Sequence, residues 1–239
     1  MTVSFSRSAE EPKDAGFVSI FDGKTLDGWD GDPKFWSVKD GAITGQTTRD
    51  TPAKANTFLV WKGGDVTDFE LRLSFKITPN NEIGFANSGI QYRSKLIDPI
   101  CFVVGGYQAD MEAGKDYTGI LYEERGREIL AQRGQKVVIR PNPDDTNQFK
   151  IDVVGSLGTP EELQSHIKPN AWNEYVIVAR GNHLQHFING HQTVDVTDEQ
   201  PAKAAKAGIL ALQLHAGQPV TVQFKNLRLK TFWPSVSAK

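Results

Sequence analysis

The chain has 239 residues, of which 38% are hydrophobic and 23% charged, and this size and composition suit one large globular domain with a sizeable core. Its 27 Lys and Arg residues nearly balance 29 Asp and Glu residues, giving a formal charge of -2 without a basic run. Nucleic acid is therefore excluded as an expected partner.

Residues 1–16 are predicted to form a polar N-terminal extension. They lack an apolar stretch of signal-peptide length, and no later segment approaches the roughly 20 apolar residues of a membrane helix. We therefore expect no transmembrane segment. The compartment stays open: a cytoplasmic protein is expected if the chain is native as written, and a periplasmic or envelope protein if a signal has been trimmed.

From residue 17 onward, short runs rich in Val, Ile, Phe and Thr alternate with clusters of Gly, Asp, Asn and Pro. This pattern is typical of an all-β sandwich or barrel. Helical periodicity is nearly absent, and no internal repeat occurs. We predict a single β-sandwich domain over residues 17–233, followed by a tail at 234–239.

Three predicted strands carry polar side chains at every second position, which places those side chains on one face of each strand. We interpret them as the lining of a shared binding groove, because they are groups that make directed hydrogen bonds and include few lysines. The alternative is the solvated face of an ordinary antiparallel sheet. The polar positions are Asn87, Gln91 and Arg93 in the first strand, Gln108, Asp110 and Glu112 in the second, and Gln213 and His215 in the third.

The second of these strands is expected to form a hairpin with residues 117–124. A tight turn after Glu112 would set Tyr122 beside Gln108 on the polar face. Glu124, two residues after Tyr122, would point to the same face. Tyr122 and Glu124 therefore join the candidate binding residues.

Cys101 is the only cysteine, so an intramolecular disulfide is impossible and a cysteine-based metal site is not expected. Because Cys101 lies in an apolar run, residues 99–104, we predict a buried, inert thiol.

Local signals in the second half of the chain predict a helix, a hairpin and a histidine cluster. Thr159 followed by Pro160 and two acids predicts a short helix with Thr159 as its N-cap. Asn189-Gly190 predicts a two-residue turn between strands at 183–188 and 191–196. Three histidines around this turn, His183, His186 and His191, lack the spacing of a zinc site and are expected to form a surface cluster.

The order and spacing of nine motifs resemble those of the 3-keto-disaccharide hydrolase domain family over nearly the whole chain. The motifs are FDGKTLDGW at 21–29, WSVKDG at 36–41, DFELR at 68–72, NSGIQYR at 87–93, GYQ at 106–108, WNEY at 172–175, ING at 188–190, LQLH at 212–215 and FKNL at 224–227.

This resemblance implies a concanavalin A-like jelly-roll sandwich of two antiparallel sheets with a polar concave groove. It also implies a small glycoside as substrate, oxidised to a ketone at C3 by a separate oxidoreductase. Family members commonly have an acid after the Gly-Tyr pair and a Gln two positions later, whereas this chain has Gln108 and Asp110.

A ketone at C3 makes the C2 proton acidic, so that the enolate can expel the C1 substituent and water can add to the enone. This route needs a base, an acid and a donor to the C3 oxygen. We assign the base role to Asp110 or His215 and leaving-group protonation to Glu112. Arg93 would stabilise the enolate with help from Gln108 or Asn87.

Two other functions compete with this one. A sandwich of this type can bind carbohydrate without catalysis. The order Gln-x-Asp-x-Glu at 108–112 also resembles the Glu-x-Asp-x-Glu strand of laminarinase-type β-glucanases, although Gln108 could not act as their nucleophile. No cofactor is assigned and no metal ligands are predicted. A divalent cation such as calcium could occupy a loop, but the sequence does not place one.

Overall fold

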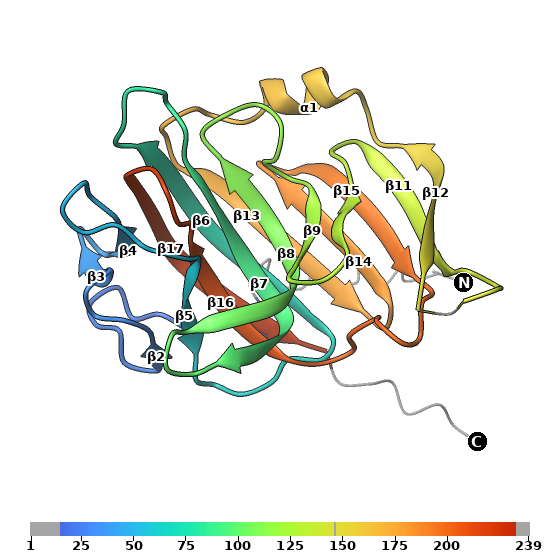
Figure 1. Cartoon of the computed structure of the whole chain (residues 1–239), viewed down its shortest axis with the longest axis horizontal. Helices are drawn as coiled ribbons and strands as arrows, with labels where there is room; N and C mark the ends of the chain where they lie inside the picture. The colour runs from blue at the N-terminus through green and yellow to red at the C-terminus, as the bar shows by residue number, and fades with distance from the viewer. Residues whose placement is uncertain (1–14, 146, 233–239) are drawn as a thin grey trace, which may run out of the picture.

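The structure, a computed structural model, describes residues 15–145 and 147–232. Two β-sheets lie face to face in it, and one short helix lies at one end of them (Figure 1). The fold is nearly all-β, as predicted. Among the described residues, no helix is long and apolar enough to cross a membrane. The predicted extension and tail, apart from residues 15 and 16, lie outside the described residues.

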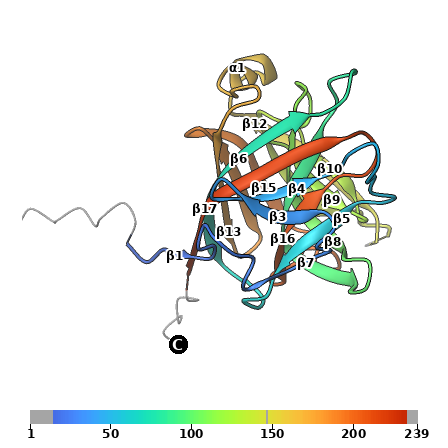
Figure 2. The same cartoon turned by 90° about the vertical axis from the view of Figure 1, so that its left-hand side faces the viewer.

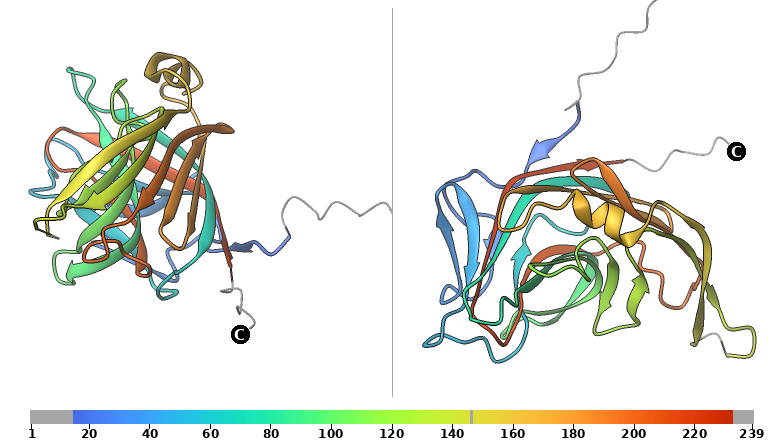
Figure 3. Two further views of the ribbon diagram at one scale, coloured as in Figure 1. Left: turned by 90° about the vertical axis from the view of Figure 1, so that its right-hand side faces the viewer. Right: turned by 90° about the horizontal axis from the view of Figure 1, so that it is seen from above.

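The larger sheet has ten strands in the order β12-β11-β15-β14-β13-β6-β17-β4-β3, with β1 paired to β17. It curves around the smaller sheet (Figure 3), and β3, β4, β6 and β17 lie in this one layer (Figure 2). Its strands are β1 (Val18–Ser19), β3 (Trp36–Lys39), β4 (Ala42–Gln46), β6 (Phe69–Pro79), β11 (Gln135–Pro141), β12 (Phe149–Ser156), β13 (Asn173–Arg180), β14 (His183–Ile188), β15 (His191–Asp198) and β17 (Val220–Thr231).

The smaller sheet has seven strands in the order β10-β9-β8-β7-β16-β5-β2. All its neighbouring strands are antiparallel, whereas the ten-stranded sheet contains one parallel pair, β11 with β15. The prediction of two antiparallel sheets is confirmed, and this pair is the parallel one among the described strands. The strands are β2 (Trp29–Asp30), β5 (Thr57–Trp61), β7 (Asn87–Asp98), β8 (Val103–Glu112), β9 (Leu121–Glu124), β10 (Glu128–Ala131) and β16 (Ile209–Leu214).

The core lies between the two sheets and follows the alternation of the strands. In β6, every second residue from Phe69 to Ile77 is buried, and the intervening residues are partly exposed. The first eight residues of β7 are all buried. One face of β7 packs in the core through Ile90 and Tyr92, so its other face must be covered as well. That second face carries the polar residues of the site.

The turn and helix predictions are confirmed. Asn189 and Gly190 have φ of 49° and 85° between β14 and β15, the left-handed conformation that such a turn requires. Helix α1 (Pro160–Ser165) begins after Thr159, whose hydroxyl accepts a hydrogen bond from the backbone N–H of Glu162 at 3.1 Å.

Two predictions about burial are wrong. Cys101 is exposed, because residues 99–102 form the turn between β7 and β8 and not part of a strand. An apolar run therefore predicted burial where the chain makes a surface turn.

His186 is buried in the core and not in a surface cluster: its Nε2 lies 3.0 Å from the Tyr92 hydroxyl. His183 instead pairs with Asp195 at 2.7 Å.

Candidate active site

The polar pocket lies on the face of the seven-stranded sheet that points away from the core. It has a volume of about 410 Å³. Strands β7, β8, β9 and β16 supply half of its lining, and β10, the β8–β9 loop and residues next to β5, β7 and β16 supply the rest. The residues that line it are Asn56, Phe85, Asn87, Gln108, Asp110, Tyr117, Tyr122, Glu124, Glu128, Ile129, Gln213 and His215.

The strand register brings these side chains together. Gln108 in β8 lies opposite Gln91 in β7 on one side and opposite Tyr122 in β9 on the other. The predicted placement of Tyr122 beside Gln108 is thus confirmed. Gly89 also faces the pocket, and a Cβ there would lie 2.4 Å from the Gln108 side chain. A glycine at this position therefore leaves the space that Gln108 fills.

A continuous set of amide hydrogen bonds organises the floor of the pocket. The Gln108 Oε1 accepts bonds from Gln91 Nε2 at 2.6 Å and from Gln213 Nε2 at 2.9 Å. Gln213 Nε2 also donates to Glu124 Oε2 at 3.2 Å. Gln91 and Gln213 are completely buried. The Gln213 Oε1 is buried without a hydrogen-bond partner among the described residues, whereas the two bonds to Gln108 Oε1 fix how the three amides are oriented.

Asp110 receives hydrogen bonds on both carboxyl oxygens. Asn87 Nδ2 donates to Oδ1 at 3.0 Å, and Gln108 Nε2 donates to Oδ2 at 3.3 Å. Only 5% of Asp110 is exposed. Desolvation disfavours its charged form more than the hydrogen bonds favour it, which raises the pKa of Asp110 to about 8. This carboxyl therefore holds a proton at neutral pH.

His215 stands at the rim of the same pocket, just beyond the end of β16. Its Nδ1 lies 2.6 Å from the carbonyl oxygen of Ala216, so in the neutral ring Nδ1 carries the hydrogen and Nε2 keeps its lone pair. The Phe85 ring packs edge-on against the imidazole at a centroid distance of 5.8 Å. His215 is thus oriented with one ring nitrogen able to accept a proton.

Tyr122 and two further aromatic side chains border the pocket. Burial and the nearby carboxylates of Glu124, Glu128 and Asp110 raise the pKa of Tyr122, so its hydroxyl stays protonated. Phe85 and Tyr117 also line the pocket and remain 37% and 41% exposed. Such rings suit stacking against the apolar face of a sugar.

Arg93 and Glu112 do not line this pocket, although both were predicted to act there. Arg93 lies at a bulge in β7 with φ of 47°, which turns its side chain toward the carbonyls of Thr67 and Gly181 and toward Asp68, at 2.7, 2.5 and 3.0 Å. A bulge breaks the alternation on which the prediction depended.

Glu112 ends β8, and its carboxylate accepts hydrogen bonds from the backbone N–H groups of Asp116 and Tyr117, the latter at 2.7 Å. These bonds fold the loop at 113–120, which presents Tyr117 to the pocket. The structure therefore gives Glu112 a loop-holding position and not one in the lining of the pocket.

Asn56 is a pocket residue that the sequence reasoning missed. Its Oδ1 accepts a hydrogen bond from Ala216 N at 3.0 Å, and its Nδ2 lies 3.4 Å from Glu124 Oε1. It precedes β5, in a segment without polar alternation, so the strand pattern gave no signal. Phe85, Tyr117, Glu128 and Ile129 were missed for the same reason, since they lie in turns or at strand ends.

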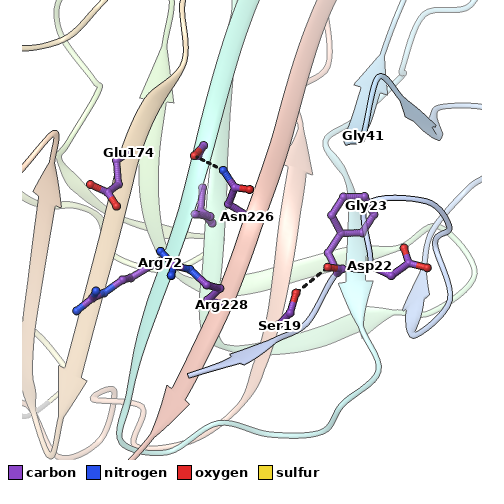
Figure 4. Close-up of a pocket in the computed structure, with 11 residues that line it drawn as sticks. Ser19, Asp22, Gly23, Gly41, Arg72, Glu174, Asn226 and Arg228 are labelled. Atoms are coloured by element: carbon purple, nitrogen blue, oxygen red, sulfur yellow. Dashed lines mark hydrogen bonds between the residues drawn. The ribbon is translucent and has the colours of Figure 1, made fainter. Parts of the chain in front are cut away.

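A second hollow, of about 510 Å³, lies on the outer face of the ten-stranded sheet (Figure 4). Its polar groups bond to their neighbours: Arg72 Nε donates to Glu70 at 2.7 Å, and Asn226 donates to Ser74 at 3.2 Å. None of the predicted site residues lies there. Nor do the described residues contain a cluster of three or more His, Cys, Asp or Glu side chains suited to a metal ion.

Solved structures with the same fold include two bacterial proteins. A candidate glycosyl hydrolase from Parabacteroides distasonis is 19% identical, with a TM-score of 0.57 over 94% of this chain and 98% of that one. Carbohydrate-binding module CBM66 from Bacillus subtilis is 15% identical, with a TM-score of 0.53 over 85% of this chain and 96% of that one. These likenesses confirm the jelly-roll sandwich.

No curated protein matches the sequence. The family model described as the 3-keto-alpha-glucoside-1,2-lyase-like domain matches residues 16–230. The match spans most of the chain, so this protein belongs to the 3-keto-alpha-glucoside-1,2-lyase-like family, and its activity is carbohydrate-related.

Proposed function

We propose that the polar pocket cleaves 3-keto-glycosides by elimination and hydration. The observation that carries the proposal is Asp110, a buried carboxyl with a pKa of about 8 in the pocket that His215 also lines. Titratable groups with unlike environments in one pocket are the arrangement that acid–base catalysis uses. Family membership supports the sugar substrate.

In the proposed reaction, a base removes the C2 proton, and the electron pair forms an enolate with the C3 ketone. The enolate then expels the C1 substituent, whose oxygen takes a proton from an acid. This step leaves an enone with a C1–C2 double bond, and water then adds its hydroxyl to C1 and a proton to C2 to give the free 3-keto sugar. No covalent bond to the protein forms in this sequence.

His215 is the proposed base at C2. Its Nδ1–H is directed to the Ala216 carbonyl at 2.6 Å, so Nε2 is the nitrogen that can take the proton. The same hydrogen bond fixes the plane of the ring, which keeps Nε2 in one direction. A positioned imidazole of this kind typically contributes about 10²–10⁴-fold to a proton transfer.

Asp110 is the proposed acid at the leaving group. Because its pKa is about 8, the carboxyl is protonated at neutral pH and can donate to the departing oxygen. Asn87 and Gln108 hold both of its oxygens in place. Asp110 thus takes the role that the sequence suggested for Glu112, whose carboxylate is bonded to the loop backbone instead.

Tyr122 is the proposed donor to the C3 oxygen. Its hydroxyl stays protonated because its pKa is raised, and it forms no hydrogen bond with any residue that the structure describes. A hydroxyl donor aimed at an oxygen that gains negative charge stabilises the enolate. Tyr122 replaces Arg93 in this role, because Arg93 is bonded elsewhere.

The remaining polar residues are proposed to bind the sugar and support the acid. Gln213 and Glu124 present hydrogen-bonding groups in the pocket, while Gln91 acts from beneath by holding Gln108. Phe85 and Tyr117 would stack on the sugar ring. A separate oxidoreductase would supply the ketone, because this mechanism requires a ketone at C3 and the proposed residues do not oxidise the sugar.

The test incubates the purified protein with matched native and 3-keto glucosides in deuterated water. We expect release of the leaving group from the keto substrate alone, through a 2-hydroxy-3-keto-glycal, with deuterium at C2 of the hydrated product. Release from the native glucoside would instead identify an ordinary glycosidase. Binding of both sugars without release would identify a carbohydrate-binding module. Either result would overturn the proposal.

A further inference from the structure

A further cavity, separate from the polar pocket and from the hollow on the ten-stranded sheet, lies where the turn between β9 and β10 meets the loop between β15 and β16. Its volume is about 830 Å³, within the range of small-molecule sites. Distal parts of β7 and β8, the turn at 125–126 and the loop at 202–207 form its walls. Glu124 contributes to this cavity and to the polar pocket, so the two adjoin along β9.

Four exposed cationic side chains line the cavity, and they come from three separate segments. They are Lys95 in β7, Arg125 in the β9–β10 turn, and Lys203 and Lys206 in the β15–β16 loop. In the part of the chain that the structure describes, no carboxylate pairs with any of them. In a chain with a formal charge of -2, this is a local concentration of positive charge.

Two acids line the cavity, and neither forms an ion pair with these four cations. Glu123 accepts a hydrogen bond from Arg127 Nε at 2.7 Å and is buried. Glu124 directs its carboxylate to Gln213 and Asn56 in the polar pocket, at 3.2 and 3.4 Å. Arg127 balances Glu123, so four cations face the single carboxylate of Glu124, and the cavity keeps an excess of positive charge for a ligand.

Small residues keep the cavity open. Four alanines of the β15–β16 loop and three glycines line it, and Ile97 and Phe149 add apolar surface. Arg125 lies in the β9–β10 turn with φ of 55°, a conformation that is uncommon for a residue with a Cβ. The glycines are Gly105, Gly106 and Gly126, and the alanines are Ala202, Ala204, Ala205 and Ala207.

We propose that this cavity binds an anionic saccharide, whose carboxylate or sulfate groups pair with Lys95, Arg125, Lys203 and Lys206. Cations from three segments around a cavity of this size suit several charges spread along one ligand and not a single small ion. The apolar walls suit the faces of sugar rings, and the chain belongs to a carbohydrate-related family. This inference does not depend on the elimination mechanism.

The test compares binding of an oligogalacturonate, a sulfated oligosaccharide of equal length and a neutral malto-oligosaccharide by titration calorimetry. We expect the anionic probes to bind and the neutral one not to bind, with affinity falling as salt is added. Lys203→Glu combined with Lys206→Glu should weaken anionic binding by roughly tenfold or more. Preference for carboxylate or for sulfate would identify the group, and either preference supports the proposal.

The matched control is Lys24→Glu with Lys62→Glu, which changes the net charge equally at exposed positions away from the cavity. It should leave the affinity unchanged. Equal binding of the neutral oligosaccharide, or equal weakening by the two double variants, would refute the proposal. So would tighter binding of a single-stranded oligonucleotide at the same salt concentration, which would mark a nucleic-acid site.

Discussion

Asp110 holds its proton at neutral pH because burial of its carboxyl disfavours the charged form. If that proton goes to the leaving group, Asp110→Asn should slow cleavage of a 3-keto-disaccharide by about 10²–10⁴-fold. Cleavage of a 3-keto-nitrophenyl glucoside should fall much less, because nitrophenolate leaves without protonation. The parent protein should also lose disaccharide activity as pH rises through about 8, the range in which Asp110 loses its proton.

Steady-state kinetics on both substrates check this prediction, with the same substitution at an exposed position, Asp65→Asn, as the control. An equal loss with both leaving groups would contradict the acid role. Activity that rises as pH increases through 8 would show that Asp110 acts as the base, the other role that the sequence left open for it.

At the scale of single residues, parity along a strand predicted most of the pocket. Gln108, Asp110 and Gln213 were placed correctly because regular strands alternate strictly between faces. Arg93 was misplaced because a bulge shifts the register between Tyr92 and Lys95. Asn56 was missed because a residue outside a strand has no parity to read. No local sequence pattern indicates the bulge in β7, and none indicates that the segment before β5, which contains Asn56, lies beside the pocket.

At the scale of elements, the loop at 113–120 connects β8 to β9 and carries Tyr117 to the pocket. Both backbone N–H groups that bond to Glu112 meet the same carboxylate oxygen. Glu112→Gln keeps an acceptor oxygen and should therefore retain most of the activity. Glu112→Ala removes the acceptor, so we expect a loss of about 1–3 kcal/mol of stability and a higher KM.

Chemical denaturation and kinetics on the two leaving groups check the prediction for Glu112. A loop-holding role predicts that the ratio of disaccharide to nitrophenyl cleavage is the same in both variants and in the parent. If Glu112 is the acid, both variants should instead lose disaccharide cleavage selectively, which would restore the sequence-based assignment.

The hairpin of β8 and β9 shows how far local pattern predicts an element. The register of Tyr122 against Gln108 was predicted correctly although β9 begins only at Leu121 and the loop is longer than expected. A two-residue side-chain period tolerates this error, because only the parity of the pairing decides the face. The apolar turn at 99–102 pairs with no strand, so no side-chain period decides which of its residues are buried. The sequence therefore predicted a buried Cys101, whereas Cys101 is exposed.

At the scale of the whole molecule, two titratable groups are buried in their neutral forms on opposite faces of the seven-stranded sheet. Asp110 faces the pocket, and His186 of β14 reaches from the ten-stranded sheet to Tyr92 in β7 at 3.0 Å. Desolvation raises the pKa of Asp110 from 3.8 to about 8 and lowers the pKa of His186 from 6.5 to about 3. Folding stability is therefore linked to pH through both groups.

The two linkages have opposite signs. Between pH 3.8 and 8 the folded state holds a proton on Asp110 that the unfolded chain has lost, so stability falls as pH rises. Between pH 3 and 6.5 the unfolded chain holds a proton on His186 that the folded state excludes, so stability rises with pH. Over the shared range, from about 4 to about 6.5, the two slopes nearly cancel.

Two single variants should separate the two pH dependences of the unfolding free energy, because each variant removes one titrating group and leaves the other. Relative to Asp110→Asn, the parent should lose up to roughly 5 kcal/mol of unfolding free energy between pH 4 and pH 8. Relative to His186→Gln, it should gain a similar amount between pH 3 and pH 6.5, whatever the constant cost of the lost Tyr92 hydrogen bond. Urea denaturation across this pH series measures both differences. If the difference in unfolding free energy between parent and variant stays constant with pH, the corresponding group is charged in the folded protein. For Asp110, this result would also contradict the proposed acid role, which requires a protonated carboxyl.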